Sequence, residues 1–228
     1  MALNSVRADI RIQKGSDMQA WKPILSQVAS EFAERGWRSF RSEILTSEPA
    51  AGGCYGWIGL NGTPMSVGAT VGLVHPELNR ICAGAANRAH GAGIGAGFTR
   101  RPGVPVLQYV VRPDERWGME RLDADRISPA DIQSYARRIE TAFHDRIDLS
   151  WSLNEIVEVF RGGGVIGGQA AMYLMPVALM MINDEAGLHA LVQDIRSGVG
   201  LGAEYEVYLE AAAEIVRGAE PPRARPLG

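Results

Sequence analysis

The stretch GCYGWIGLNGTPMSVGATVGLVHP, residues 53–76, decides the fold of this chain. Apolar side chains occupy every second position of its second half and therefore share one face of a strand: Met65, Val67, Ala69, Val71 and Leu73. The dipeptide Asn61-Gly62 favours a tight hairpin turn and separates this strand from the one before it. Such alternation is typical of an antiparallel sheet with one face on a core. The stretch therefore predicts two adjacent strands of an antiparallel meander.

Further elements are predicted on both sides of this pair of strands. Before it, a helix that ends at Gly36 precedes a strand in which Phe40 and Ile44 alternate with charged residues. After it, Pro76 begins a short helix, and residues 104–113, VPVLQYVVRP, have the composition of a fourth strand.

The second half of the chain is predicted to be helical. Ser128–Asp131 and Ser152–Glu155 are capping boxes, Asn183-Asp184 can cap a further helix, and residues 204–217 carry the apolar stripe of a last one. We therefore predict an α+β fold. It comprises an antiparallel meander of about four strands with flanking helices, followed by a mostly helical C-terminal half.

The same patterns divide the chain into four segments. Residues 1–112 form the α+β portion with the antiparallel sheet, 113–127 a connector, 128–218 a helical portion packing on it, and 219–228 a disordered tail. A single domain that contains both portions is the alternative.

Composition and charge exclude several classes of function. With 228 residues, 46% hydrophobic and 21% charged, the chain has an ordinary globular composition. Its net charge of −3 and scattered basic residues argue against nucleic-acid binding, which needs a basic stripe. The longest apolar run, residues 170–182, is shorter than the roughly 20 residues that cross a bilayer. Without a secretory signal pattern, we expect a cytoplasmic protein with no membrane association, and the preference for Arg over Lys indicates a bacterial source.

Cysteine and histidine positions predict no metal site. Cys54 and Cys82 are too few for a disulfide framework or a thiolate cage, so each is expected to be a small buried hydrophobe. His144 and Asp148 are four residues apart, a spacing also found in metal-dependent phosphohydrolases. The other histidines lie at loop or strand ends or beside an apolar stripe, which leaves this pair without the further ligands that such enzymes need.

A glycine motif raises the possibility of a dinucleotide site. The G-x-G-x-x-G spacing is met by Gly162, Gly164 and Gly167, and Asp184 follows at the distance expected for a ribose-binding acid. This arrangement resembles the corresponding stretch of flavin- and nicotinamide-dependent oxidoreductases. The capping box before the glycines, however, predicts a helix where that motif requires a strand. We expect Gly162 to end a helix and the following glycines to join two helices.

The predicted partner-binding residues are Tyr55, Trp57, His90, Arg100 and Arg101. The two aromatics lie on the half-exposed meander, and aromatic side chains are enriched at protein interfaces. The other three belong to a glycine-rich stretch at 86–105, predicted to be a long loop able to contact an anionic ligand.

The sequence favours a non-enzymatic protein-binding protein that uses no cofactor. The order of elements is similar to that of small bacterial α+β proteins that bind another protein, such as immunity proteins of toxin systems. The alternative is an FAD- or NAD-dependent oxidoreductase that uses the glycine motif. A homo-oligomer assembled through the helical half also stays open.

Overall fold

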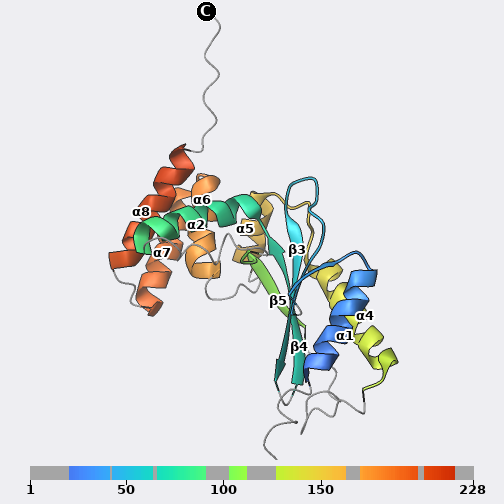
Figure 1. Cartoon of the computed structure of the whole chain (residues 1–228). Helices are drawn as coiled ribbons and strands as arrows, with labels where there is room; N and C mark the ends of the chain where they lie inside the picture. The colour runs from blue at the N-terminus through green and yellow to red at the C-terminus, as the bar shows by residue number, and fades with distance from the viewer. Residues whose placement is uncertain are drawn as a thin grey trace, which may run out of the picture.

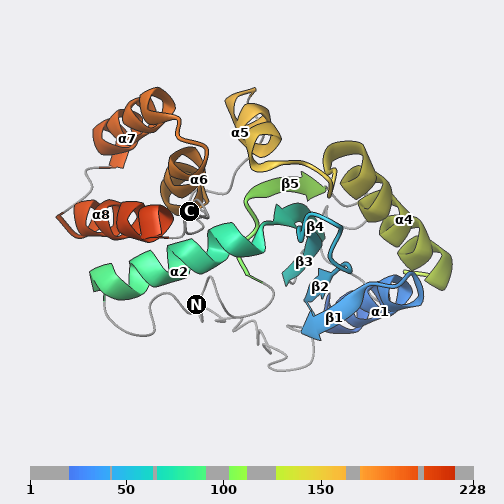
Figure 2. The same ribbon diagram turned by 90° about the horizontal axis from the view of Figure 1, so that it is seen from above.

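A five-stranded antiparallel sheet organises the computed structural model (Figure 1). The structure describes residues 21–41, 43–63, 66–90, 103–111, 127–162, 170–199 and 203–218. Helices α1 (Trp21–Glu34) and α4 (Pro129–Arg146) lie side by side along one face of the sheet in both views (Figures 1 and 2). The remaining helices gather beyond one end of the sheet (Figure 1). The predicted α+β fold, with its helix-rich C-terminal half, is confirmed.

The sheet is a simple meander in chain order. Its strands are β1 (Arg38–Arg41), β2 (Ile44–Thr46), β3 (Tyr55–Thr63), β4 (Ser66–Val74) and β5 (Leu107–Val111). The predicted strand around Phe40 and Ile44 is in fact two short strands, because the chain reverses between them and Arg41 pairs with Ile44. This reversal accounts for five strands instead of four.

The hairpin turn between β3 and β4 does not lie at Asn61-Gly62, so that prediction was wrong. Both residues belong to β3, opposite Gly68 and Val67, and pairing continues to Thr63 and Ser66. Gly62 serves a packing role instead, since a Cβ there would stand 2.6 Å from the Trp21 ring. Close packing of α1 on the sheet therefore outweighs the local turn preference.

The face of the sheet towards α1 and α4 carries the predicted apolar set. The side chains of Val67, Ala69, Val71 and Leu73 are all completely buried, whereas Met65 lies outside the described residues. This result confirms the predicted alternation and fixes which face of the meander meets the core.

An aromatic cluster joins this face of the sheet to both helices. Trp37 packs edge-to-face on Phe32 and on Phe143, with ring centroids 5.8 and 5.1 Å apart. Gly56 of β3 lies directly beneath, and a Cβ at that position would stand 2.6 Å from the Phe143 ring and 2.9 Å from Trp37. The absence of a side chain at Gly56 is what allows the rings to reach the strand.

Predicted helix ends agree with the structure. Gly36 follows α1 with φ of +85°, and Ser128 forms the expected reciprocal capping box with Asp131 at the start of α4. The helix that begins at Pro76, α2 (Pro76–His90), is longer than predicted. Residues 86–90, predicted as the start of a loop over 86–105, therefore belong to this helix, and that part of the prediction was wrong. Contacts with the helical half account for the extra length: Arg88 pairs with Glu214 of α8 at 3.0 Å.

The helical half is built around α2. The elements after α4 are α5 (Leu153–Arg161), the π-helix η4 (Ala170–Leu174), α6 (Met175–Met181), α7 (Glu185–Val199) and α8 (Ala203–Gly218). Helices α2 and α8 pack closely, and Gly84 leaves room for Ile215, whose Cδ1 atom would lie 2.9 Å from a Cβ there. Figure 2 shows α2 running from the sheet into this group.

The apolar run at 170–182 belongs to the interior, as predicted. Leu174, Met175, Val177 and Ala178 are fully buried, in η4 and α6. Two backbone carbonyls of the π-helix accept hydrogen bonds from tyrosines of α8, Tyr205 to Met172 at 2.6 Å and Tyr208 to Tyr173 at 2.8 Å. Within the described ranges, no helix is both long enough and apolar enough to span a bilayer.

Candidate functional site

The face of the sheet opposite α1 and α4, here called the outer face, carries both predicted aromatic residues. Along β3, Ile58 and Leu60 are buried towards the helices, so Tyr55 and Trp57 point the other way and are partly exposed. The register places Thr46 and Gly72 on either side of Trp57. The structure therefore brings these two predicted residues together on one surface.

The absence of a side chain at Gly59 lets the Trp57 indole lie over β3, because a Cβ at Gly59 would stand 2.3 Å from the ring. Gly72 packs elsewhere, since a Cβ there would stand 2.6 Å from the carbonyl oxygen of Leu107 and 2.9 Å from Pro105. The indole Nε1 atom is buried, and no hydrogen-bond acceptor for it is found in the part of the chain that the structure describes.

A cavity of about 570 Å³ opens beside Tyr55. It lies where β1, the segment after β2 and the start of α2 meet, and we call it the corner cavity. Its lining combines aromatic, charged and backbone groups: Arg38, Ser39, Phe40, Thr46, Ser47, Glu48, Pro49, Gly53, Tyr55, Pro76, Asn79, Arg80 and Gly103. A volume of this size admits a small molecule or one or two side chains of a protein.

Phe40 is the most unusual residue of this cavity. It is 45% exposed, one of few large hydrophobic side chains in the described ranges with so much surface in solvent. The sequence pattern gave no reason to separate it from core residues, because alternation within a single predicted strand does not reveal that the strand folds back on itself. Phe40 is a site residue that the sequence-based interpretation missed.

Two exposed ion pairs border the corner cavity. Arg38 pairs with Glu48 at 2.5 Å, and Arg80 makes two hydrogen bonds to Glu77, at 2.8 and 2.6 Å. The hydrogen bond from Arg80 lowers the pKa of Glu77, against a smaller opposing effect of burial. Exposed pairs of this kind contribute little to stability, so their charges can be redirected to a ligand at low cost.

A buried amide fixes one wall of the cavity. Asn79 is 3% exposed, and its Nδ2 donates to the carbonyls of His75 (3.2 Å) and Val104 (3.0 Å) while its Oδ1 accepts from the Val104 N–H (2.8 Å). Gly103, with φ of +77°, runs close to both Asn79 and the Tyr55 hydroxyl. The amide thus ties the segment before β5 to the first turn of α2.

His75 supplies the cap of α2 at the edge of the same cavity. Its Nδ1 atom accepts a hydrogen bond from the backbone N–H of Leu78 at 3.2 Å, which is the role that Asn or Ser plays at other helix starts. Burial lowers the pKa of His75, although the charge of Glu77 partly opposes this. The neutral imidazole is therefore the form that the folded protein favours.

Because His75 caps α2, we expect the free energy of unfolding to decrease at mildly acidic pH. Because the pKa of His75 is lower in the folded state than its ordinary value of 6.5, the cap contributes fully above pH 6.5 and is lost as the pH falls through the folded-state pKa. Protonation removes the Nδ1 acceptor, a loss of about 1 kcal/mol. In His75→Asn the amide oxygen keeps the cap and does not titrate. Urea titrations of both proteins from pH 5 to 8 should show a stability difference that grows only towards acid, whereas parallel profiles would contradict this role.

The other predicted binding residues do not join the outer face. His90 is at the far end of α2, about 21 Å along the helix from Pro76, and its Nδ1 lies 3.5 Å from Glu204 of α8. It belongs to the contact between two helices of the helical half. Arg100 and Arg101 lie outside the described residues.

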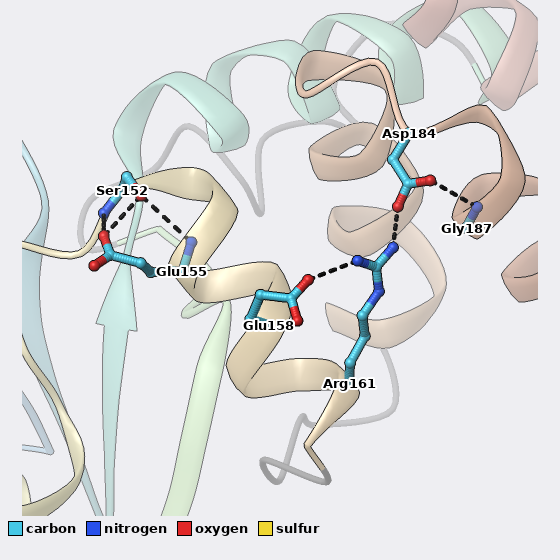
Figure 3. Close-up of polar contacts among 6 residues, drawn as sticks. All are labelled: Ser152, Glu155, Glu158, Arg161, Asp184 and Gly187. Atoms are coloured by element: carbon cyan, nitrogen blue, oxygen red, sulfur yellow. Dashed lines mark hydrogen bonds and ion pairs between the residues drawn. The ribbon is translucent and has the colours of Figure 1, made fainter.

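The glycine motif begins at a helix end, as expected. The capping box of Ser152 and Glu155 opens α5 (Figure 3). Gly162 is the C-cap of this helix and donates from its N–H to the carbonyl of Glu158 at 2.9 Å. A helix therefore stands where the dinucleotide motif requires a strand. Gly164 and Gly167 lie outside the described residues.

Asp184 is engaged within the helical half. One carboxylate oxygen accepts from the backbone N–H of Gly187 at 2.9 Å, which caps α7, and the other pairs with Arg161 of α5 (Figure 3). Arg161 also bonds Glu158 at 2.6 Å. The hydrogen bond from Gly187, followed by Arg161, lowers the pKa of Asp184. The carboxylate holds the α5 end beside α7.

Cysteines and metal-binding residues give no further site in the described ranges. Both cysteines, Cys54 and Cys82, are buried thiols, as predicted. Burial raises the pKa of Cys82 to about 12, so this group stays a neutral thiol, which is a poor nucleophile. His144 and Asp148 are both exposed. No group of three or more metal-ligating side chains comes together among the residues that the structure describes.

The candidate site is therefore the outer face around Trp57 together with the corner cavity beside Tyr55. Comparison with known protein families, with curated proteins and with solved structures found no match to this chain.

Proposed function

We propose that this chain is a non-enzymatic protein-binding protein, comparable in its mode of action to an immunity protein or an inhibitor, whose partner packs on the outer face. The observation that carries the proposal is the arrangement of Tyr55 and Trp57 beside a cavity of about 570 Å³ with the exposed ring of Phe40 at its edge. Aromatic anchors next to a pocket are the typical centre of a protein interface.

The surface around Trp57 on the outer face suits contact with a protein better than binding of a small molecule. Trp57 lies over Gly59 and pairs with Gly72 of β4, which packs against Pro105, so the surface presents a partly exposed aromatic ring on β3. A partner that covers this ring removes apolar area from water.

The corner cavity suits one anchoring side chain of the partner. Phe40 and Tyr55 provide apolar walls, and the Arg38–Glu48 and Arg80–Glu77 pairs provide charges of both signs at the rim. An apolar centre with a polar rim is the usual anatomy of such a contact. The rigid Asn79 wall keeps this pocket formed before binding, which limits the ordering cost on association.

Phe40→Ser is the sharpest test of this proposal. The ring is 45% exposed, so its removal is expected to change stability by no more than about 0.5 kcal/mol while weakening partner binding at least about tenfold. The chain is used as bait in its native lysate, the captured protein is purified, and its affinity is measured for wild type and variant. Val207→Ser, at a similarly exposed position on α8, is the matched control.

Two results would count against this function. Equal affinity of wild type and Phe40→Ser for the captured partner would place binding elsewhere. Turnover of a small molecule that Phe40→Ser and Trp57→Ala leave unchanged, with no stoichiometric partner recovered, would replace the binding function by an enzymatic one.

A further inference from the structure

Two rows of residues cross the outer face from β2 to β5, and both consist of uncharged residues. The strand register aligns four residues in one row: Ile44, Gly59, Thr70 and Val110. Two positions away, it aligns four more: Thr46, Trp57, Gly72 and Gln108. Alternate residues of a strand point to the same side, so both rows lie on the face that carries Trp57. We call these two sets the uncharged rows.

The uncharged rows expose apolar surface. Val110 is 72% exposed, and Ile44 and Trp57 are partly exposed. The Trp57 ring extends from its own row to the other, because a Cβ on Gly59 would overlap it. The described helices that pack on the strands, α1 and α4, lie on the opposite face (Figure 1). These helices therefore leave the apolar groups of the rows accessible to a partner.

The uncharged rows form a patch that is longer across the strands than along them. Ile44 and Val110 are three strand spacings apart, which corresponds to about 14 Å. The two rows are separated by two residues of each strand, about 7 Å. Asn61 and Gly68 form the next pair, and a Cβ on Gly68 would stand 2.6 Å from the side-chain oxygen of Asn61. The exposed amide of Asn61 thus ends the apolar patch on that side.

Backbone hydrogen bonding restricts what can cover this patch. The strands β2, β3 and β4 each have a neighbour on both sides, so their N–H and C=O groups pair within the sheet. An extended peptide lying on this face would bury its own backbone groups without partners, which costs free energy. A helix satisfies its backbone groups internally, and with a diameter of about 10 Å it covers both rows at once. The face therefore favours a helix over a strand.

The absence of charge in the rows determines the polarity of that helix. A charged side chain held against Ile44, Trp57 or Val110 would lose its hydration without gaining an ion pair. The charged pairs of the site, such as Arg38 with Glu48, lie at the corner cavity instead. Apolar side chains towards the rows and polar side chains towards solvent are the complement of this surface.

We propose that the uncharged rows bind an amphipathic helix of the partner protein, which lies across β2 to β5 with its apolar side on the sheet. This inference rests on the proposed function, because it assigns a secondary structure and a polarity to the partner of the outer face. Apolar residues at i, i+4, i+7 and i+11 share one side of a helix and extend over about 16 Å. That length matches the span from Ile44 to Val110, and Thr70 lies beneath the helix.

The proposal is tested with a sixteen-residue peptide on the isotope-labelled full chain. The peptide carries leucine at these four positions and alanine, glutamine, lysine and glutamate elsewhere. NMR titration is expected to shift the amide signals of the rows and to give a dissociation constant below about 1 mM. Thr70→Lys places a charge under the helix and should weaken binding at least about tenfold. Val110→Ser should weaken it at least about threefold, whereas Val207→Ser, at an exposed valine of α8, is the matched control and should bind like wild type.

A scrambled peptide separates recognition of a helix face from general apolar attraction. It has the same composition but leucines on all sides of the helix, and it should bind at least about tenfold more weakly. Circular dichroism verifies that each variant keeps its fold. Equal binding of the scrambled peptide, equal binding by wild type and both row variants, or no binding of the designed peptide at about 1 mM would each overturn the proposal.

Phe40→Ser separates this inference from the proposed function. Phe40 is not part of the rows, so this variant is expected to bind the peptide like wild type while losing affinity for the partner captured from the lysate. If the peptide does not bind but the captured partner still requires Phe40, the helix proposal fails and the proposed function stands. If the peptide binds and Phe40→Ser leaves the affinity of the captured partner unchanged, the proposed function fails on its own test and the helix site does not.

Discussion

Replacing Phe143 with alanine is expected to lower the free energy of unfolding by about 3–5 kcal/mol. The Phe143 ring is 2% exposed and fills the space between α4 and the strand at Gly56. It also packs edge-to-face on Trp37 at 5.1 Å. Truncation leaves a cavity between the sheet and the two helices that cover it, and neither rigid layer can close the gap.

Gly56→Val tests the same contact from the strand. Its Cβ would stand 2.6 Å from Phe143, so the ring must move, at a cost of about 1–3 kcal/mol or more. In the double variant with Phe143→Ala, the valine enters the space that the ring has left. The loss of stability is therefore expected to be smaller than the sum of the two single losses.

Urea unfolding followed by tryptophan fluorescence measures all three variants. Thr141→Ala, on the exposed side of the same helix, is the control and should stay within about 0.5 kcal/mol of wild type. Strict additivity of the two substitutions would show that Gly56 and Phe143 are not in contact.

Asn79→Leu is expected to destabilise the protein by about 2–4 kcal/mol. Leucine has a similar size but no polar atoms, so the Val104 N–H and the carbonyls of His75 and Val104 lose the partners that Asn79 provides at 2.8–3.2 Å. These groups are partly buried between α2 and the segment before β5, and of the three only the His75 carbonyl keeps a further bond, from the Asn79 backbone N–H at 3.1 Å. Each buried group without a partner retains its desolvation cost.

The consequence of Asn79→Leu extends to the corner cavity. Gly103 packs against Asn79 and the Tyr55 hydroxyl, so release of residues 103–104 is expected to loosen that wall. Amide hydrogen exchange should become faster at 104–111 while α4 changes little. Asn87→Leu, at an exposed position of the same helix, is the control; a loss of stability equal to that of Asn79→Leu would indicate a general effect of leucine on α2.

Local patterns in the sequence were sufficient for much of the fold. The alternation from Val67 to Leu73 predicted a strand with one buried face, and all of its apolar residues are buried. The capping boxes at Ser128 and Ser152 predicted helix starts that the structure confirms. These features depend on contacts within a few residues, so the local sequence carries the necessary information.

Features that depend on contacts across the chain were predicted less well. Asn61-Gly62 has the local preference of a turn but lies in a strand, because Trp21 packs on Gly62. Phe40 was assigned to a single strand because a reversal after Arg41 has no strong local signal. At Gly62, packing against a distant residue decides the conformation, whereas the reversal after Arg41 is a short hairpin without the usual turn residues.

By itself, the sequence determined the fold class, the buried face of the meander and the ends of several helices, since hydrophobic periodicity and capping are local. Only the tertiary structure decided where the candidate site lies. Tyr55 becomes part of a cavity because β1 and α2 meet there, and Phe40 lies at the same cavity because the chain reverses after Arg41. Such surfaces are made of residues far apart in the chain, and their positions follow from strand register and helix packing.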